Sequence, residues 1–174
     1  MARIARFLLF VVGCSPGLFS QPIRSTLTLD AALRQAGLRV VLDTSRSRTS
    51  SEIRIRWQSQ AARVIQRIDR SDPPPKQRSP ELSPDHLVIA FLDDAGTVRH
   101  TQVVVDPRLV RGEFPDANGN LRKTELVRDD VEMSVSAPGG LNAAEVRVFT
   151  PNWDSGELRL VPLASVTMPG GPRQ

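Results

Sequence analysis

The sequence predicts a mainly β protein, an antiparallel β-sandwich with one short N-terminal helix. Three observations lead to this prediction. Short apolar or alternating stretches recur about every ten residues in the second half of the chain, and Gly, Pro and Asn separate them. The chain has 14 prolines and many valines and leucines, which favours strands joined by tight turns. The 3.6-residue period of a helix is clear at only one place.

Residues 1–20 are predicted to be a secretory signal peptide, because two arginines precede an apolar run and small residues follow it. Two cleavage sites fit. The stretch 11–14, VVGC, resembles the lipobox of bacterial lipoproteins, which implies cleavage before Cys14 and lipid attachment to it. Cleavage near Ser20 implies a soluble secreted protein. An N-terminal buried strand or helix is the alternative to both.

The expected location is therefore extracytoplasmic: periplasmic, anchored to the outer membrane by a lipid, or secreted. No segment approaches the ~20 apolar residues that span a bilayer, so the lipid is the only expected contact with a membrane. Export argues against nucleic acid as a partner. Cys14 is the single cysteine, so burial of a core and not a disulfide must stabilise the fold.

A short helix is expected next, at the start of segment 21–70. Thr28 is a plausible N-cap, Asp30 lies in the first turn, and Gly37 follows the last turn. Its apolar face comprises Leu29, Ala32, Leu33 and Ala36.

The rest of segment 21–70 predicts a basic β-hairpin. Residues 38–43 form a β-type run and 44–51 are turn-like. The stretch 52–57, EIRIRW, alternates strictly, which is the period of a half-buried strand. Its inner face would hold Ile53, Ile55 and Trp57, and its outer face is rich in arginine. The following stretch, 62–69, fits a strand or a helix.

The charge of the chain is unevenly distributed. Residues 39–78 hold ten Arg or Lys against four acids, whereas residues 79–174 hold nine against fourteen. The basic hairpin would therefore suit an anionic partner. Alternatively, it packs beside the acidic second half of the same chain or is solvated. Its candidate contact residues are Arg46, Arg48, Arg54 and Arg56.

Residues 71–86 contain five prolines, the last at position 84, and this composition predicts a linker or long loop. Residues 87–168 predict the core of the sandwich, and 169–174 a flexible tail. Within the core, 87–92 is apolar on both faces, as in a central strand covered twice. A glycine turn (93–96) and an Asn-Gly turn (115–120) are expected. The other predicted strands are 97–106, 109–114, 131–137, 144–149 and 156–163.

The stretch 87–163 resembles the immunoglobulin-like and fibronectin-like modules of bacterial exported proteins. The resemblance lies in the opening strand, DxxG turn and strand, and in the closing alternating strands. It implies an immunoglobulin-like sandwich of the type without a disulfide, and it transfers no functional residue.

Few residues carry chemistry. His86 and His100 are the only candidates for a general base, no nucleophile elbow is present, and no zinc or phosphate-loop pattern occurs. The acids in DDAG (93–96) are better explained by turn hydrogen bonds than by glycosidase chemistry. The oxygen ligands in 116–120 are better explained by a hairpin turn than by a calcium loop. Trp153 lies in a polar stretch expected to be an exposed turn.

These observations favour a non-catalytic, exported module that binds an envelope protein or an anionic envelope polymer. The candidate contacts are the four arginines and Trp153. One alternative is a small hydrolase, or an accessory domain of one, that uses His86 or His100. Another is a structural component of envelope assembly. The sequence predicts no cofactor and no metal ion, and it leaves the oligomeric state open.

Overall fold

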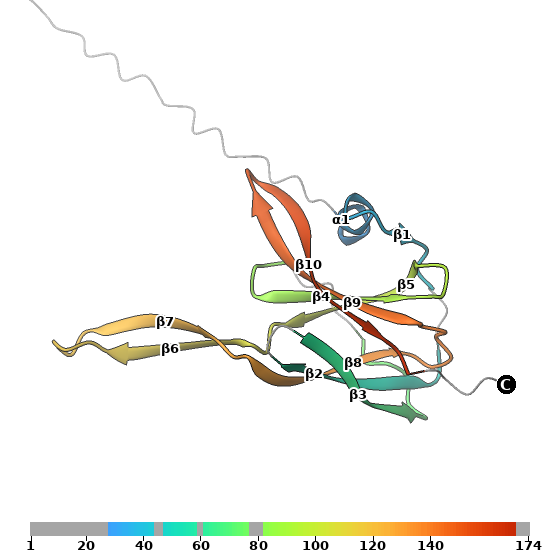
Figure 1. Ribbon diagram of the computed structural model, residues 1–174, viewed down its shortest axis with the longest axis horizontal. Helices are drawn as coiled ribbons and strands as arrows, with labels where there is room; N and C mark the ends of the chain where they lie inside the picture. Colours follow the sequence, from blue (N-terminus) through green and yellow to red (C-terminus); the bar gives the residue numbers. More distant parts are fainter. Residues whose placement is uncertain (1–27, 44–46, 59–60, 77–81, 170–174) are drawn as a thin grey trace, which may run out of the picture.

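The computed structural model describes residues 28–43, 47–58, 61–76 and 82–169, and in this part the chain is mainly β. A five-stranded sheet has the order β1-β5-β4-β9-β10, a three-stranded sheet has the order β3-β2-β8, and β6 and β7 form a hairpin (Figure 1). The elements are α1 (Leu29–Gln35), β1 (Arg39–Val40), β2 (Ser50–Gln58), β3 (Ala61–Arg70), β4 (His86–Leu92), β5 (Thr97–Val105), β6 (Leu109–Pro115), β7 (Leu121–Val127), β8 (Asp130–Pro138), β9 (Glu145–Asp154) and β10 (Glu157–Thr167).

The two larger sheets face each other across one apolar core. Alternate residues of β2 and β8 point into it, as the alternation in the sequence predicts. Ile53, Ile55 and Trp57 are buried there, which confirms the predicted inner face. Strands β4 and β9 supply the opposite wall with Leu87, Ile89, Phe91, Val146 and Val148.

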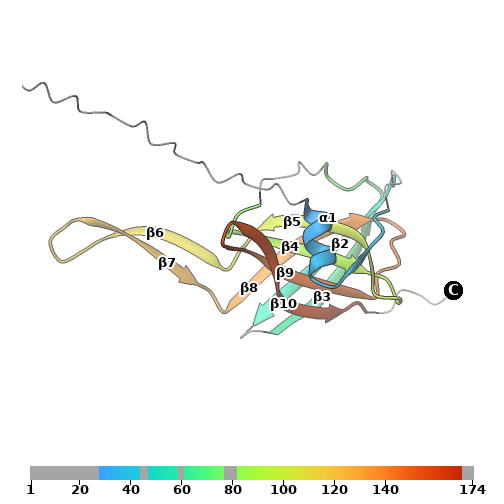
Figure 2. The same cartoon turned by 90° about the horizontal axis from the view of Figure 1, so that it is seen from above.

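A second core lies on the other face of the five-stranded sheet. Helix α1 covers this face, so the body has three layers (Figure 2). Strand β4 contributes alternate residues to both cores, and every residue from Leu87 to Leu92 is buried. The prediction that 87–92 is a central strand covered on both sides is confirmed.

Helix α1 forms where its capping residues predict it. The hydroxyl of Thr28 accepts a hydrogen bond from the backbone N–H of Ala31 at 3.3 Å, and Asp30 lies in the first turn. Gly37 has φ +81°, a conformation that favours glycine after a helix. Ala32 and Leu33 are buried against the sheet, which stabilises a helix too short to persist alone.

The predicted pairing of 38–43 with 52–57 in one hairpin is wrong. Strand β1 pairs in parallel with β5, and β2 pairs with β3 and β8. The reason is that Leu38 and Val40 are buried in the second core beside α1, to which they are closely linked in the chain. The basic hairpin is therefore β2–β3, and the ambiguous stretch 62–69 is a strand.

The Pro-rich stretch connects the two sheets. Residues 71–76 and 82–85 contain no strand, and they lie between β3 of the smaller sheet and β4 of the larger one. Because β2 pairs with β8, segments before and after this stretch build the same core.

Candidate functional site

The hairpin β6–β7 projects from the body as a two-stranded arm (Figures 1 and 2). Its register runs from Leu109 opposite Val127 to Pro115 opposite Leu121. Each strand has seven residues, which gives an arm about 23 Å long. Among the described helices and strands, β6 and β7 pack only against each other. We call residues 109–127 the arm.

The turn at the tip of the arm is stabilised by its own side chains. The carboxylate of Asp116 accepts hydrogen bonds from the backbone N–H groups of Asn118 and Asn120, both at 2.9 Å. Those bonds, with help from Arg122, hold the pKa of Asp116 below its usual value. Gly119 has φ +81° and closes the turn. The hairpin turn predicted at 115–120 is confirmed.

Strand β7 was not predicted from the sequence. Its seven residues, LRKTELV, are all exposed, so they show no buried face. The available signal was the turn itself, because a strand at 109–114 followed by an Asn-Gly turn requires a return strand of similar length.

The arm carries apolar side chains that the body does not cover. Leu121 is 68% exposed, Leu126 is 59% exposed and Val127 is 55% exposed, and all three lie on β7. An isolated two-stranded hairpin is only marginally stable in water. Leu121 and Val127 lie on one face of this strand and Leu126 on the other, so the arm offers exposed apolar side chains on both of its faces.

Arg108 fixes the root of the arm to the body. Its guanidinium donates to both carboxylate oxygens of Asp106, at 3.0 and 2.7 Å, and lies 4.5 Å from the centre of the Trp57 ring. The carboxylate of Asp106 is buried and the side chain of Arg108 is mostly buried. Arg108 also accepts a backbone hydrogen bond from Arg128, so the two strands of the arm enter and leave the body at one anchored point.

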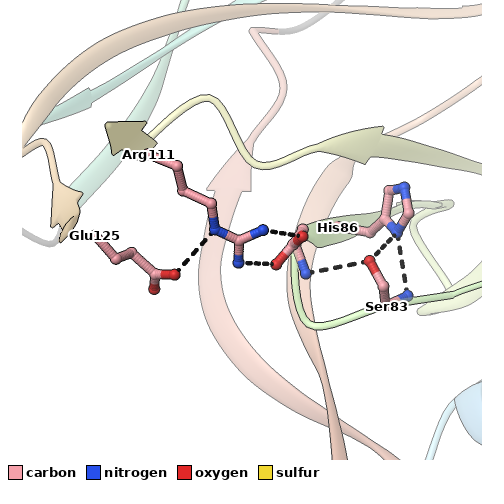
Figure 3. Close-up of polar contacts among 5 residues, drawn as sticks. Ser83, His86, Arg111 and Glu125 are labelled. Atoms are coloured by element: carbon pink, nitrogen blue, oxygen red, sulfur yellow. Dashed lines mark hydrogen bonds and ion pairs between the residues drawn. The ribbon is translucent and has the colours of Figure 1, made fainter. Parts of the chain in front are cut away.

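A second contact lies one step further along the arm. Arg111 donates to both oxygens of Asp85 at 2.5 Å and to Glu125 at 3.1 Å (Figure 3). The contact links β6 to the loop before β4 and to β7. Arg111 holds the pKa of Asp85 below its usual value, and the two carboxylates raise the pKa of Arg111. The arm therefore has a fixed root and a free outer part.

His86 lies beside this contact, and its ring takes part in a local turn. Its Nδ1 accepts from the backbone N–H of Ser83 at 3.1 Å and lies 2.8 Å from the Ser83 hydroxyl (Figure 3). The neighbouring carboxylate, Asp85, accepts at both oxygens from Arg111. This geometry holds the strand start in place, and it matches the expected position of His86 at the beginning of a strand.

His100 is in the middle of β5, as expected. Its ring packs against Phe91 with 5.5 Å between the ring centres. Burial lowers the pKa of His100 and so favours its neutral form. The two histidines are far apart along the β4–β5 pair. His86, at the start of β4, pairs with Val105, whereas His100 pairs with Phe91 near the end of β4.

Two of the predicted arginine contacts, Arg54 and Arg56, lie beside carboxylates. Arg56 binds Asp130 of β8 through two hydrogen bonds of 3.0 and 2.8 Å, and Arg54 lies 3.8 Å from Glu52. Arg48 is exposed in the bend before β2. The arginines of β2 thus lie beside acids, one of them from the second half of the chain. Two other predicted site residues, Cys14 and Arg46, lie outside the described residues.

Trp153 is on another sheet. It is 38% exposed, which agrees with the expected exposure, but the expected turn position is wrong. Trp153 belongs to β9, opposite Leu158 of β10, and the turn comes later, at Ser155 and Gly156. Strands β9 and β10 stay paired through Asn152 and Asp154, because the chain reverses only at Ser155 and Gly156, where φ is positive.

An open depression of about 670 Å³ lies beside the DDAG turn. Asp93 faces it, but its carboxylate accepts from the backbone N–H groups of Ala95 and Thr97 and from Arg99. The turn role expected for this acid is confirmed. Within the described ranges, no group of three or more potential ligands is placed to hold a metal ion.

Comparisons with known proteins give no relative: no family model, curated protein or solved structure matches this chain. Among the described residues, no helix is both long and apolar enough to cross a membrane. The arm, its root and the pairing partners described above are therefore the basis for a functional proposal.

Proposed function

We propose that this chain is a non-catalytic module that binds a protein partner through its arm. One observation carries the proposal: a two-stranded hairpin projects from a well-packed body and exposes Leu121, Leu126 and Val127 on β7. Apolar side chains on a marginally stable element gain most from being covered by a partner.

The root of the arm supports the same proposal. Arg108 and Arg111 direct the hairpin away from the body through ion pairs with Asp106 and Asp85. An anchored arm loses less conformational entropy on binding than a free loop does, which favours affinity.

The extracytoplasmic location remains part of the proposal, together with an anionic or envelope partner for the basic hairpin. The support is the charge imbalance and the pattern of residues 1–20. The ion pairs of Arg56 with Asp130 and Glu132 weigh against a strongly basic surface on β2. Arg48, which is exposed, is the best remaining candidate for an anionic contact.

We also propose an immunoglobulin-like arrangement for the body. In its support, the order β10-β9-β4-β5 matches the G-F-C-C′ order of that fold, with β8 in the place of strand E. The smaller sheet departs from the pattern, because β2 and not β3 pairs with β8. An experimental structure tests the assignment. If β3 lies at the centre of the smaller sheet, the immunoglobulin-like arrangement is supported; if the order of the larger sheet differs, it is wrong.

The alternative is a small hydrolase that uses His86 or His100, and the short contact between Ser83 and His86 is the observation in its favour. Replacing both histidines by alanine tests it. If a screen of ester and peptide substrates finds an activity that this double variant loses, the protein is an enzyme, and the proposal of a non-catalytic module is wrong.

Site-specific photo-crosslinking tests the proposed module. A photo-reactive amino acid replaces Leu126 in the full chain, and Val161 on β10 is the matched control because it is also an exposed aliphatic residue. After irradiation in the cells that make the protein, we expect a discrete adduct at Leu126 that exceeds the control several-fold. Equal labelling at the two positions, or none, contradicts a binding role for the arm.

A further inference from the structure

The free edge of the arm can be deduced from its hydrogen-bond ladder. Near the root, the N–H of Arg128 donates to the carbonyl of Arg108, and near the tip the N–H of Asp116 donates to the carbonyl of Asn120. In an antiparallel pair, hydrogen-bonded and non-hydrogen-bonded positions alternate. Even-numbered residues of β7 therefore direct their backbone groups toward β6, and odd-numbered residues direct theirs outward.

No other described strand pairs with this outer edge of β7. Its outward positions are Leu121, Lys123, Glu125 and Val127, whose N–H and C=O groups are available to another strand. Unpaired edges of this kind are templates for strand addition. The side chains at the same positions decide which strand fits.

We infer that the strand that fits is β7 of a second copy, paired antiparallel about a two-fold axis at Thr124. In this register Lys123 is opposite Glu125 of the second copy, and Glu125 is opposite its Lys123. Leu121 is opposite Val127 of the second copy. All these positions are odd-numbered, so each pair exchanges two backbone hydrogen bonds. The inference rests on the proposed function, because it identifies the partner of the arm.

The side-chain rows of both arms extend across the resulting four-stranded sheet. Within one arm, Arg111 is opposite Glu125 and Glu113 is opposite Lys123. Across two arms, one row therefore reads Arg111, Glu125, Lys123 of the second copy and Glu113 of the second copy, so the charge alternates over four strands. The next rows outward are apolar, and they are formed by Leu109, Val127, Leu121 and Pro115. Opposite charges and apolar pairs across strands both stabilise a sheet.

The neighbouring symmetric registers lack this complementarity. An axis at Lys123 places two lysines opposite each other, and an axis at Glu125 places two glutamates opposite each other. Like charges directly opposite across strands are destabilising. A two-fold axis requires the same residue from each copy at its centre, and Thr124 is the uncharged residue between the two charged ones.

Charge reversal with mixing tests the inference on the purified full chain. In sedimentation velocity over a concentration series, the wild-type chain is expected to form a reversible dimer. Lys123→Glu and Glu125→Lys each create two like-charge pairs by symmetry, so each is expected to raise the dimer dissociation constant about tenfold or more. Mixing the two variants restores opposite charges and is expected to give a heterodimer.

Each variant also places like charges opposite each other within its own arm, at Glu113 or at Arg111. Mixing does not restore these contacts, so a recovered dimer reports on the interface between the two copies alone. Lys76→Glu and Glu157→Lys are the matched controls: both residues are exposed on the body, and the changes in net charge are the same. They are expected to leave the dimer unchanged. A wild-type chain that stays monomeric, or a mixture without heterodimer, overturns the inference.

A cross-link tests the register independently. In a Cys14→Ser background, Thr124→Cys places two thiols at the symmetry axis, in a non-hydrogen-bonded pair with Cβ atoms about 4.5–5.5 Å apart. We expect a disulfide-linked dimer on oxidation. Arg122→Cys is the control, because its expected neighbour is Leu126 of the second copy. Equal cross-linking of both variants contradicts the Thr124 axis.

The outcomes also separate the two proposals. A monomeric wild-type chain whose Leu126 cross-links to a different protein overturns the pairing of two copies and leaves the proposed function intact. A Leu126 adduct that contains two copies of the chain supports both. Absence of any adduct at Leu126 overturns the proposed function.

Discussion

At the scale of single residues, Arg108 has the most consequential position. It joins the turn between β5 and the arm, where it binds Asp106, to Trp57 of β2, which is distant in sequence. The sequence predicted that Trp57 is buried, because alternation identifies the inner face of a strand. Alternation does not identify which distant cation covers the ring, so the contact with Arg108 was not predictable.

Removal of Arg108 is expected to destabilise the protein. Arg108→Ala leaves the buried carboxylate of Asp106 without its cationic partner, although the backbone N–H of residue 108 still donates to it; the loss costs about 3 kcal/mol of unfolding free energy. Equilibrium denaturation measures the loss. Arg159→Ala is the control, since its 3.5 Å contact with Asp154 is exposed and its removal should change stability by about 0.5 kcal/mol or less. Equal effects of the two variants would show that the buried pair does not stabilise the fold.

Acid is expected to release the second contact of the root. The pKa of Asp85 is lowered by Arg111, so this contact stabilises the fold above the unfolded pKa of about 3.9 and is lost as the pH falls through the lower folded value. Carboxyl resonances in a pH titration by NMR measure the midpoint. Arg111→Gln should move the midpoint of Asp85 upward, and an unchanged midpoint argues against the pairing.

At the scale of elements, the sequence predicted those that bury one face or both. Helix α1, the central strand β4 and the alternating strand β8 were all predicted, because burial imposes a period on the side chains. Strand β7 buries no face and was missed. Strand β1 was placed in the wrong sheet, because two residues of strand give no information about their partner.

The turn of the arm gives an element-scale prediction. Gly119 has φ +81°, so Gly119→Ala is expected to destabilise the hairpin by about 1 kcal/mol. Amide hydrogen exchange in β7 should then accelerate about fivefold, while exchange in β4 stays unchanged. Gly119→Asn is the matched variant, because asparagine tolerates this conformation better. If both variants exchange at the wild-type rate, the turn does not limit the stability of the arm.

At the scale of the whole molecule, the body and the arm are separate in packing. The body has two cores that share β4, whereas β6 and β7 pack only against each other among the described elements. The candidate site was accordingly the part least predictable from sequence. The four arginines and Trp153 were chosen as charged or aromatic residues. The structure places Arg54 and Arg56 on β2, Arg48 in the bend before β2 and Trp153 on β9 of the other sheet, and it pairs Arg56 with acids.

Removal of the arm is expected to leave the body folded. A chain in which an Asn-Gly connection replaces residues 110–126 keeps Arg108 and both cores. Its unfolding free energy should remain within about 1 kcal/mol of the wild-type value, because among the described side chains the tie removed between arm and body is the exposed contact of Arg111 with Asp85. Chemical denaturation followed by circular dichroism measures this value. Loss of cooperative unfolding would mean that the arm is part of the structural core.

The outward backbone positions of β6 have a consequence for how far any assembly of arms grows. Pro115 occupies one of them and has no N–H to offer, and at another the side chain of Arg111 is bound to Asp85. Once β7 is covered, the opposite border of the sheet is a poor template for the next strand. Assembly through the arms would therefore end at a finite particle and would resist extension into fibrils.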